Sequence, residues 1–301
     1  MSSAGSVGGA MTPRFDTVSF LSDYGTTDEF VGVVHSVIRS LAPEVRVIDV
    51  THQVAPFDVR AGALALARSA QYLAPGVVVA VVDPGVGTTR RRVAVEVGDG
   101  ASILVGPDNG LLAPAVAMVG GATRAVELTN REYHLVAPGP TFDGRDVFAP
   151  VAAHLCNGVP LDEVGTDLDP ASLLPTIIPL TREEDGGLEA EVLWIDGFGN
   201  AQLNVDPDEI AAFGDVVRVR CGDLTRIAKR ADTFADLGVG EIGLVIDSYG
   251  LVALAADRES AAVSLRLASG DAVRLEPVDD DNADPTGDVT VAVQLGPRVR
   301  S

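Results

Sequence analysis

Apolar and polar positions follow two different patterns in the two parts of the chain. Up to about residue 180, short β-branched runs alternate with longer segments rich in Ala and Leu, which predicts strands and helices in turn. The predicted strands are residues 18–21, 45–50, 77–82, 93–97 and 103–105, and the predicted helices are residues 29–41 and 58–73. Asp146 is predicted to cap one more helix, which runs to Leu155 and has Pro150 in its first turn.

From about Gly187, short alternating segments replace the long helical ones. We predict strands at residues 189–195, 216–221, 242–247, 251–255, 262–267 and 289–294, with one short helix at residues 207–213. Three prolines mark residues 168–184 as a linker. The sequence therefore predicts a flexible tail at residues 1–14, an α/β domain at residues 15–180, and an all-β domain, a small barrel or sandwich, at residues 187–301.

Composition restricts the class of ligand. The 301 residues are 47% hydrophobic, which excludes disorder for most of the chain, and 43 acidic against 22 basic side chains give a net charge of −21. A nucleic-acid partner or an anionic membrane surface is disfavoured, because phosphate binding relies on a Lys/Arg footprint that this chain lacks. A cationic or zwitterionic small molecule is the easier ligand.

The cysteines and the N-terminus indicate a compartment. Cys156 and Cys221 are too few for a disulfide framework, which suits a reducing cytoplasm. No apolar run reaches the ~18 residues that span a bilayer, and the first residues lack the basic and apolar regions of an export signal. We expect a cytoplasmic protein. The acidic segment 279–285 is expected to be a solvated loop.

Acidic residues follow the predicted strands, where ligands bind in an open α/β sheet. After the first strand, Asp28 is placed to cap the next helix. Asp23 lies at the strand end itself, where a carboxylate could accept hydrogen bonds from a sugar diol or an ammonium group. After residues 77–82, Asp83 precedes Arg90 by seven positions. The glycines between them match no phosphate-binding motif, so the pair is either a structural salt bridge or part of a site.

Later motifs have both structural and functional interpretations. Asp143 lies beside a glycine and Arg145, ahead of the predicted helix. Residues 196–200 are a plausible hairpin turn, but Phe198 and Asn200 are also the residue types that bind a purine by stacking and edge hydrogen bonds. Residues 247–250 are similarly turn-like. No metal site is predicted, because no zinc spacing is seen among the four histidines, His35, His52, His134 and His154.

Six motifs in order make a specific pattern: SDYGTTDEFVG, VDPGVGTTRR, GPDNGLL, TFDGRDVFAPVAAHL, IDGFGN and DSYGLVALA. From about Phe15 to about Leu267, the chain resembles the S-adenosyl-L-methionine (SAM) hydroxide adenosyltransferases, or SAM hydrolases, which are relatives of fluorinase and chlorinase. The resemblance implies an N-terminal Rossmann-like α/β domain, a C-terminal β-barrel, and a homotrimer with active sites between subunits. It also implies attack of water on the ribose C5′ of SAM, which releases adenosine and L-methionine without a cofactor or metal.

The resemblance assigns roles to individual residues. The implied substrate contacts are Asp23 for the ribose hydroxyls, Asp28 and Asp196 for the methionine portion, Thr141 near C5′, Phe198, Asn200 and the backbone near Arg258 for adenine, and Ser248 for the amino-acid end. The family handles water with an aspartate, an arginine and a histidine. Asp83 and Arg90 match the first two, but Asp143 replaces the histidine that many members have.

Three alternatives stay open. A halogenase would have to desolvate a halide beside Asp83, where like charges repel, and the halogenating relatives have an uncharged residue there. The departure at Asp143 leaves open a non-catalytic SAM-binding protein. The many aspartates leave open a metal-dependent hydrolase.

Overall fold

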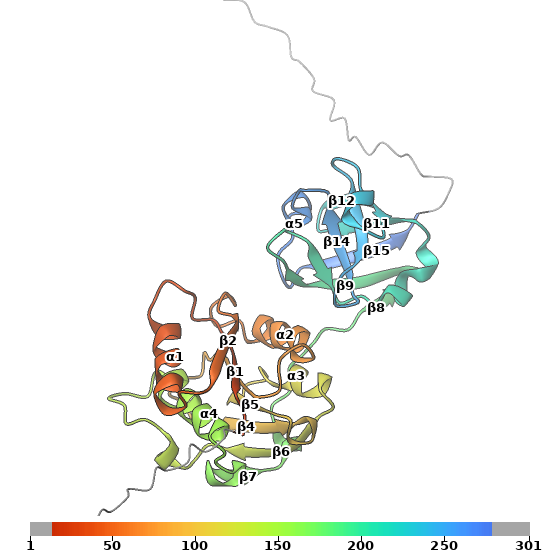
Figure 1. Cartoon of the computed structure of the whole chain (residues 1–301). Helices are drawn as coiled ribbons and strands as arrows, with labels where there is room; N and C mark the ends of the chain where they lie inside the picture. Colours follow the sequence, from red (N-terminus) through yellow and green to blue (C-terminus); the bar gives the residue numbers. More distant parts are fainter. Residues whose placement is uncertain (1–13, 279–301) are drawn as a thin grey trace, which may run out of the picture. The chain divides into compact units, whose positions relative to one another are not determined.

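The computed structural model describes residues 14–278, and the chain divides into two compact units between Ile178 and Pro179 (Figure 1). Each unit has a hydrophobic core of its own. The predicted tail up to residue 13, the acidic segment 279–285 and the predicted strand 289–294 lie outside the described residues.

The first unit is built on a seven-stranded sheet with the order β2-β1-β3-β5-β4-β6-β7. Its strands are β1 (Thr17–Ser22), β2 (Arg46–Thr51), β3 (Val77–Val81), β4 (Arg92–Val97), β5 (Ser102–Pro107), β6 (Ala122–Glu127) and β7 (Thr166–Leu168). The first four in sheet order are parallel, and the others add antiparallel pairs. The predicted α/β class is confirmed.

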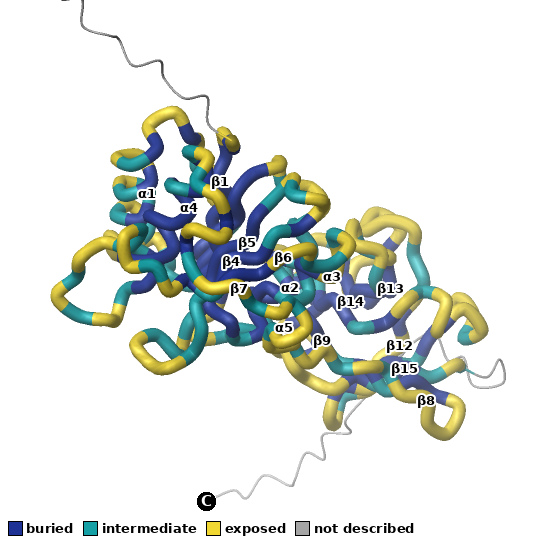
Figure 2. The backbone as a smooth tube through the Cα atoms, turned by 90° about the horizontal axis from the view of Figure 1, so that it is seen from below, coloured by how far each residue is buried: buried dark blue, intermediate teal, exposed yellow. Residues whose placement is uncertain are grey.

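Helices cover both faces of this sheet. They are α1 (Phe30–Leu41), α2 (Val59–Ala70), α3 (Ala113–Met118) and α4 (Ala149–Cys156). The core under α1 and α4 contains Val77, Val79 and Val81, whereas Val78 and Ala80 belong to the core under α2 and α3. β3 is therefore buried on both faces, as its continuous apolar run predicts. Figure 2 shows β1, β4 and β5 buried as well.

The sheet brings two candidate carboxylates to one edge. β1 and β3 are adjacent and parallel, with Ser22 beside Val81, so Asp23 and Asp83 follow neighbouring strand ends. The strand order reverses at this point, because β2 lies beyond β1 on one side and β5 lies beyond β3 on the other. Open α/β sheets bind ligands at such a point.

Helix α4 begins differently from the prediction. A π-helical turn, Gly144–Phe148, leads into it, and Pro150 lies in its first turn. Asp146 does not cap the helix, since its carboxylate accepts hydrogen bonds from Arg145 instead. An apolar pattern locates a helix, but it does not distinguish a π-turn from a first α-turn.

The second unit is a closed β-barrel. Seven strands follow the order β10-β14-β13-β12-β11-β15-β9, the pairing of β9 with β10 closes the ring, and β8 extends it beside β9. The strands are β8 (Arg182–Glu184), β9 (Gly187–Ile195), β10 (Ala201–Leu203), β11 (Val216–Cys221), β12 (Leu224–Arg230), β13 (Ile242–Ile246), β14 (Val252–Ala256) and β15 (Ala272–Pro277). Only β12 and β13 pair in parallel among these strands. The barrel resolves the choice between barrel and sandwich.

One predicted strand of this unit, residues 262–267, is wrong. It is the helix α5 (Ala261–Leu265), and the Ser260 side chain caps it by accepting a hydrogen bond from the Val263 N–H (3.1 Å). In so short a segment, an alternating pattern and a helical one coincide. The predicted short helix is confirmed as the 3₁₀ helix Pro207–Phe213, which begins with a capping box of Asp206 and Glu209.

Both cysteines are free and buried. Burial raises the pKa of the Cys156 thiol to about 12 and that of Cys221 to about 11, so neither is an activated nucleophile. Within residues 14–278, no helix is long and apolar enough to cross a membrane.

Candidate active site

A buried ion pair follows β3. Arg90 donates from Nε to Asp83 Oδ1 (2.8 Å) and from Nη2 to Asp83 Oδ2, which makes a two-pronged pair. The Arg90 and Asp83 side chains are only 10% and 5% exposed. This geometry fixes the orientation of the carboxylate.

Asp143 shares the same guanidinium group. Its Oδ2 accepts hydrogen bonds from Arg90 Nη2 and from Arg92 Nε (2.7 Å). Two carboxylates and two guanidinium groups, Asp83, Asp143, Arg90 and Arg92, thus form one group of balanced charge, which we call the Asp83 network; Arg92, whose side chain is 29% exposed, is its most exposed member. Burial lowers the pKa of Arg90, but the hydrogen bonds and charges of Asp83 and Asp143 outweigh it and raise that pKa overall. Arg90 is therefore cationic.

Asp23 and Tyr24 lie beside the Asp83 network. Asp23 Oδ2 accepts a hydrogen bond from the Phe57 N–H (2.9 Å). Burial raises the pKa of Asp23, backbone hydrogen bonds lower it in part, and the charge of Asp83 raises it further. Burial raises the pKa of Tyr24 too, and the charges of Asp23, Asp83 and Asp143 add to the rise. Such charge effects weaken with distance, so these three carboxylates lie within electrostatic range of the Tyr24 hydroxyl.

Two glycines bring the loops of this site together. A Cβ at Gly144 would lie 2.2 Å from the Tyr24 hydroxyl oxygen. Gly87 has a φ of +80°, and a Cβ there would lie 3.0 Å from the Pro140 carbonyl oxygen. The loop after β3 therefore packs against the segment that holds Thr141.

Asp28 and Thr141 are exposed near this end of the sheet. The prediction that Asp28 caps α1 is wrong, because Glu29 is at the N-cap position and no side chain makes a cap hydrogen bond. Phe30, in the first turn of α1, packs edge-on against Phe142, with ring centroids 5.1 Å apart. The start of α1 and the Thr141 segment are thus neighbours.

In the barrel, Asp196 organises the turn between β9 and β10. Its Oδ1 accepts hydrogen bonds from the N–H groups of Phe198 and Asn200 (both 2.9 Å), and its Oδ2 accepts one from Asn200 Nδ2 (2.8 Å). The hairpin interpretation is confirmed. The turn also leaves the Phe198 side chain exposed, as stacking on a purine requires.

The other two predicted barrel residues lie in loops next to β14. Ser248 lies in the turn from β13 to β14, where Asp247 accepts hydrogen bonds from the Tyr249 N–H (2.8 Å) and from Gln202 of β10. Arg258 follows β14 with a φ of +56° and an exposed side chain. A pocket of about 500 Å³ adjoins the hairpin turn, lined among others by Asp196, Phe198, Ser260 and Arg266.

Arg92 is a member of the site that the sequence reasoning missed. The signal was present in the run of three arginines at residues 90–92, because alternate residues of an extended chain share a face. Arg90 and Arg92 both bind Asp143, whereas Arg91 binds Asp108, which follows β5 (2.7 Å).

His134 is the second missed residue. Its Nε2 is buried without a hydrogen-bond partner. Burial lowers the pKa of His134, the charge of Arg92 lowers it further, and the charge of Asp143 raises it, so the ring lies within electrostatic range of the Asp83 network. It lies nine positions before Asp143, and its sequence surroundings contain no signal for this position.

A different group has the spacing of metal ligands among the described residues, namely His35, Asp49 and His52. It shares no residue with the Asp83 network. No zinc spacing is visible in the sequence because the ligands come from separate elements, α1 and the end of β2.

Residues 18–165 match the SAM hydroxide adenosyltransferase N-terminal domain, and residues 190–274 match the C-terminal domain of the same family. The chain belongs to the SAM hydroxide adenosyltransferase family. The resemblance drawn from the six motifs is thereby confirmed, and the two matched segments correspond to the sheet unit and the barrel.

The relatives of this member of the adenosyltransferase family include SAM hydrolases and fluorinases. A (R)-S-adenosyl-L-methionine hydrolase from Salinispora tropica is 46% identical over 258 residues, which cover 86% of this chain and 97% of that protein. A hydrolase of the same name from Thermus thermophilus is 37% identical over 86% of this chain and 98% of its own length. A fluorinase from Actinopolyspora mzabensis is 30% identical over 86% and 96%.

A solved structure from Thermotoga maritima, an uncharacterized conserved protein, has the same fold with a TM-score of 0.79. It is 35% identical and covers 86% of this chain and 99% of its own.

Proposed function

We propose that this enzyme hydrolyses S-adenosyl-L-methionine to adenosine and L-methionine. The observation that carries the proposal is the buried Asp83–Arg90 pair at the point where the strand order reverses, in a chain 46% identical to a protein named as a SAM hydrolase. The fluorinases are more distant, at about 30% identity.

The reaction is a displacement at the ribose C5′. A water oxygen forms a bond to C5′, the C5′–S bond breaks, and its electron pair goes to sulfur, which becomes the thioether of methionine. The water loses one proton, which Asp83 accepts or passes to solvent. The sulfonium is itself a good leaving group, so we propose that the reaction uses no metal or cofactor.

Orientation of the water supplies most of the catalysis. Alignment of reacting atoms about 3–3.5 Å apart accounts for ~7–11 kcal/mol in favourable cases. Arg90 holds both oxygens of Asp83 in place and stabilises hydroxide character as the proton leaves. Asp143 and Arg92 in turn fix the Arg90 guanidinium.

The remaining predicted residues bind the substrate in this proposal. Asp23 holds the ribose hydroxyls, and Thr141 lies near C5′. Phe198, Asn200 and the backbone near Arg258 hold adenine, while the methionine portion is bound by Asp28, Asp196 and Ser248. A cationic, zwitterionic substrate suits a chain with a net charge of −21. The site must bind a positive charge that disappears in the transition state, so weak contacts at the sulfonium serve it better than an ion pair.

We also propose a cytoplasmic homotrimer in which the barrel of one subunit completes the site of its neighbour. The family resemblance supports this assembly. The distribution of the predicted residues supports it too, because the water-handling residues lie in the first unit and the adenine-binding residues in the second. The two free, buried cysteines suit a reducing compartment.

One experiment tests the reaction. The purified protein is incubated with SAM in ¹⁸O-water, with and without EDTA, and in low and high chloride. The nucleoside products are separated by chromatography, and their masses are determined by mass spectrometry. We expect adenosine with one ¹⁸O at C5′ in every condition. 5′-Chloroadenosine as the main product in high chloride would establish a halogenase. Loss of turnover in EDTA with an unchanged unfolding midpoint would establish a metal-dependent hydrolase. Unchanged SAM would leave only a binding protein.

A further inference from the structure

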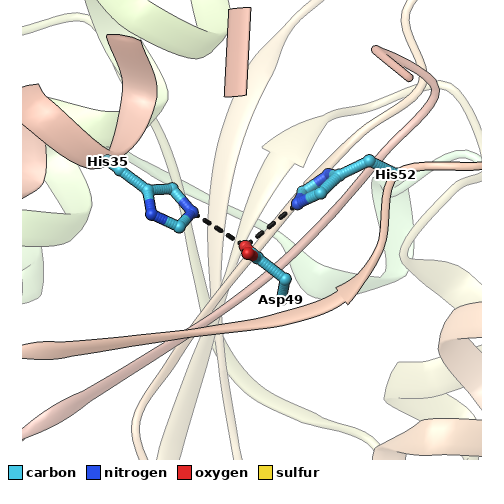
Figure 3. A group of neighbouring side chains, drawn as sticks. All are labelled: His35, Asp49 and His52. Carbon is cyan, nitrogen blue, oxygen red and sulfur yellow. Dashed lines mark hydrogen bonds and ion pairs between the residues drawn. The ribbon is translucent and has the colours of Figure 1, made fainter. Parts of the chain in front are cut away.

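Two histidines and one aspartate that are not members of the Asp83 network converge on one another. His35 comes from α1, Asp49 from β2 and His52 from the loop after β2. His35 Nε2 lies 2.8 Å from Asp49 Oδ1, and His52 Nε2 lies 3.0 Å from the same oxygen. Figure 3 shows both rings directed at the Asp49 carboxylate from opposite sides.

His52 is held in the manner of a metal ligand. Its side chain is 4% exposed, and its Nδ1 lies 2.7 Å from the Ser22 hydroxyl oxygen. Its Nε2 is buried and makes no hydrogen bond of good geometry, although the Asp49 oxygen lies 3.0 Å away. Histidines that ligate a metal have the second ring nitrogen fixed by such a contact. In the metal-bound form, the Ser22 hydroxyl oxygen accepts a hydrogen bond from His52 Nδ1–H, which leaves the Nε2 lone pair free for an ion.

The distances suit one divalent ion. Zinc lies about 2.0–2.1 Å from imidazole nitrogen and about 2.0–2.2 Å from carboxylate oxygen. Two ligands at about 90–109° around such an ion are about 2.9–3.4 Å apart. The two ring nitrogens lie 2.8 and 3.0 Å from the Asp49 oxygen, one within that range and one just below it. All three donor atoms lie within 4.8 Å of one another. Asp49 and His35 are partly exposed, so they can adjust and an ion can enter from solvent.

We propose that His35, Asp49 and His52 bind a divalent transition-metal ion, with zinc as the reference. Imidazole and carboxylate ligands suit zinc, and a strongly acidic chain attracts cations. Three protein ligands leave coordination positions for water. The ion would join α1 to β2 and, through Ser22, to the strand end that precedes Asp23. Its role is to stabilise this corner of the sheet, and no proposed substrate contact is among its ligands.

The competing arrangement has no ion. In it, each ring carries its proton on Nε2 and both rings share the Asp49 carboxylate. Zinc binding distinguishes the two, since only the first arrangement predicts one saturable site per chain.

The test uses the full chain without an affinity tag, stripped with EDTA and then dialysed. Zinc binding is measured by calorimetry, and cobalt(II) is added separately to record its visible absorption. We expect one ion per chain in the wild type and in His154→Gln, a control histidine outside the group. His35→Ala and Asp49→Asn, both at partly exposed positions, are expected to bind zinc at least ~10-fold more weakly.

Zinc is also expected to raise the unfolding midpoint of the wild type and His154→Gln, but not that of His35→Ala. The proposal is overturned if the wild type shows no saturable zinc site, or if His35→Ala binds zinc as tightly as the wild type. Adenosine formation is measured on the same samples. A wild type that forms adenosine but binds no zinc would overturn the metal site alone, and one that binds zinc but forms no adenosine would overturn SAM hydrolysis alone.

Discussion

Two similar buried ion pairs follow neighbouring strands of the sheet. Asp83 binds Arg90 after β3, and Asp108 binds Arg91 after β5. Both carboxylates are almost fully buried. We assign a role with water only to the first pair, so the second pair is a matched control for the stability that any such pair contributes.

Asp83→Asn is expected to lower kcat about 10²–10⁴-fold, because the amide cannot accept the proton of water. SAM binding should change little. Asp108→Asn is expected to lower the thermal unfolding midpoint by about as much as Asp83→Asn does. Its kcat should stay close to that of the wild type. Rates of adenosine formation, SAM binding by calorimetry and unfolding curves are compared. Equal losses of kcat in both variants would show that Asp83 acts through stability alone.

Asp143 differs from the residue that many family members have. Asp143→His restores that residue and is expected to remain active. Asp143→Ala should lower kcat more than SAM binding, because it removes the group that holds Arg90 and Arg92 together. Asp143→Asn, which keeps the shape, serves as the control for packing. Wild-type turnover in Asp143→Ala would show that this carboxylate only fixes the loop.

His134 predicts a pH dependence of stability. Burial lowers the pKa of this ring, and so do the charges of Arg92 and Arg131, against a rise from Asp143. In the unfolded chain the pKa of His134 is about 6.5, and in the folded chain it is lower. Between the two values, the unfolded state binds a proton at His134 and the folded state does not. Stability therefore falls as the pH decreases from about 6.5 toward the folded value.

His134→Gln, which does not titrate, should lose less stability than the wild type between about pH 7.5 and pH 5.5. Urea unfolding at both pH values measures the difference. His154→Gln is a comparison for the effect of burial alone. Burial lowers the pKa of His154 as well, but this histidine lies outside the Asp83 network. The hypothesis fails if the wild type and His134→Gln lose the same stability on acidification.

Among the elements, the π-helical turn Gly144–Phe148 depends on a close approach to the loop after β1. Gly144→Ala would place a Cβ 2.2 Å from the Tyr24 hydroxyl oxygen, and such overpacking typically costs about 1–3 kcal/mol of unfolding free energy. Adding Tyr24→Phe removes the oxygen, so the double variant should regain part of the loss. Denaturant unfolding of the two single variants and the double variant gives the coupling. Additive effects would show that the two groups do not press on each other.

Elements were predictable where one pattern dominates. The run at β3 is apolar on both faces and predicts a buried strand, and the helical period of α1 and α2 predicts both helices. The sequence predicts a strand at α5 because five residues are too few to distinguish an alternating pattern from a helical one, although Ser260 is a helix-capping residue there. β12 was not predicted, because its exposed positions hold mostly polar residues such as Thr225, Arg226 and Lys229.

The candidate site was predictable to the extent that its residues follow strands. Asp23 and Asp83 could be placed because parallel strands end at one edge. Arg92 and His134 could not be placed in the same way, since their position depends on the packing of the π-helical turn and of the loop before it. The His35–Asp49–His52 group likewise forms only when α1 packs on β2.

At the scale of the whole molecule, the predicted residues divide between the two units. Those for water and ribose, Asp23, Asp28, Asp83, Arg90, Thr141 and Asp143, belong to the first unit, and those for adenine and the amino-acid end, Asp196, Phe198, Asn200, Ser248 and Arg258, belong to the second. A head-to-tail ring of three subunits would unite one set from each of two neighbours. Ultracentrifugation is expected to show a trimer at assay concentration, and a fully active monomer would contradict the composite site.

Mixing of variants tests the composite site directly. Asp83→Asn has a defective first unit and an intact barrel, whereas Phe198→Ala has an intact first unit and a defective barrel. If sites form between subunits, unfolding the two variants together and refolding them should regenerate sites with both halves intact, up to about one quarter of all sites for random assembly of a head-to-tail ring. Asp83→Asn mixed with Asp143→Ala is the control, because both defects lie in the first unit and no site can obtain an intact first unit from either variant. Recovery in the first mixture but not in the second requires a site made by two subunits, whereas no recovery in either mixture would place both halves in one chain.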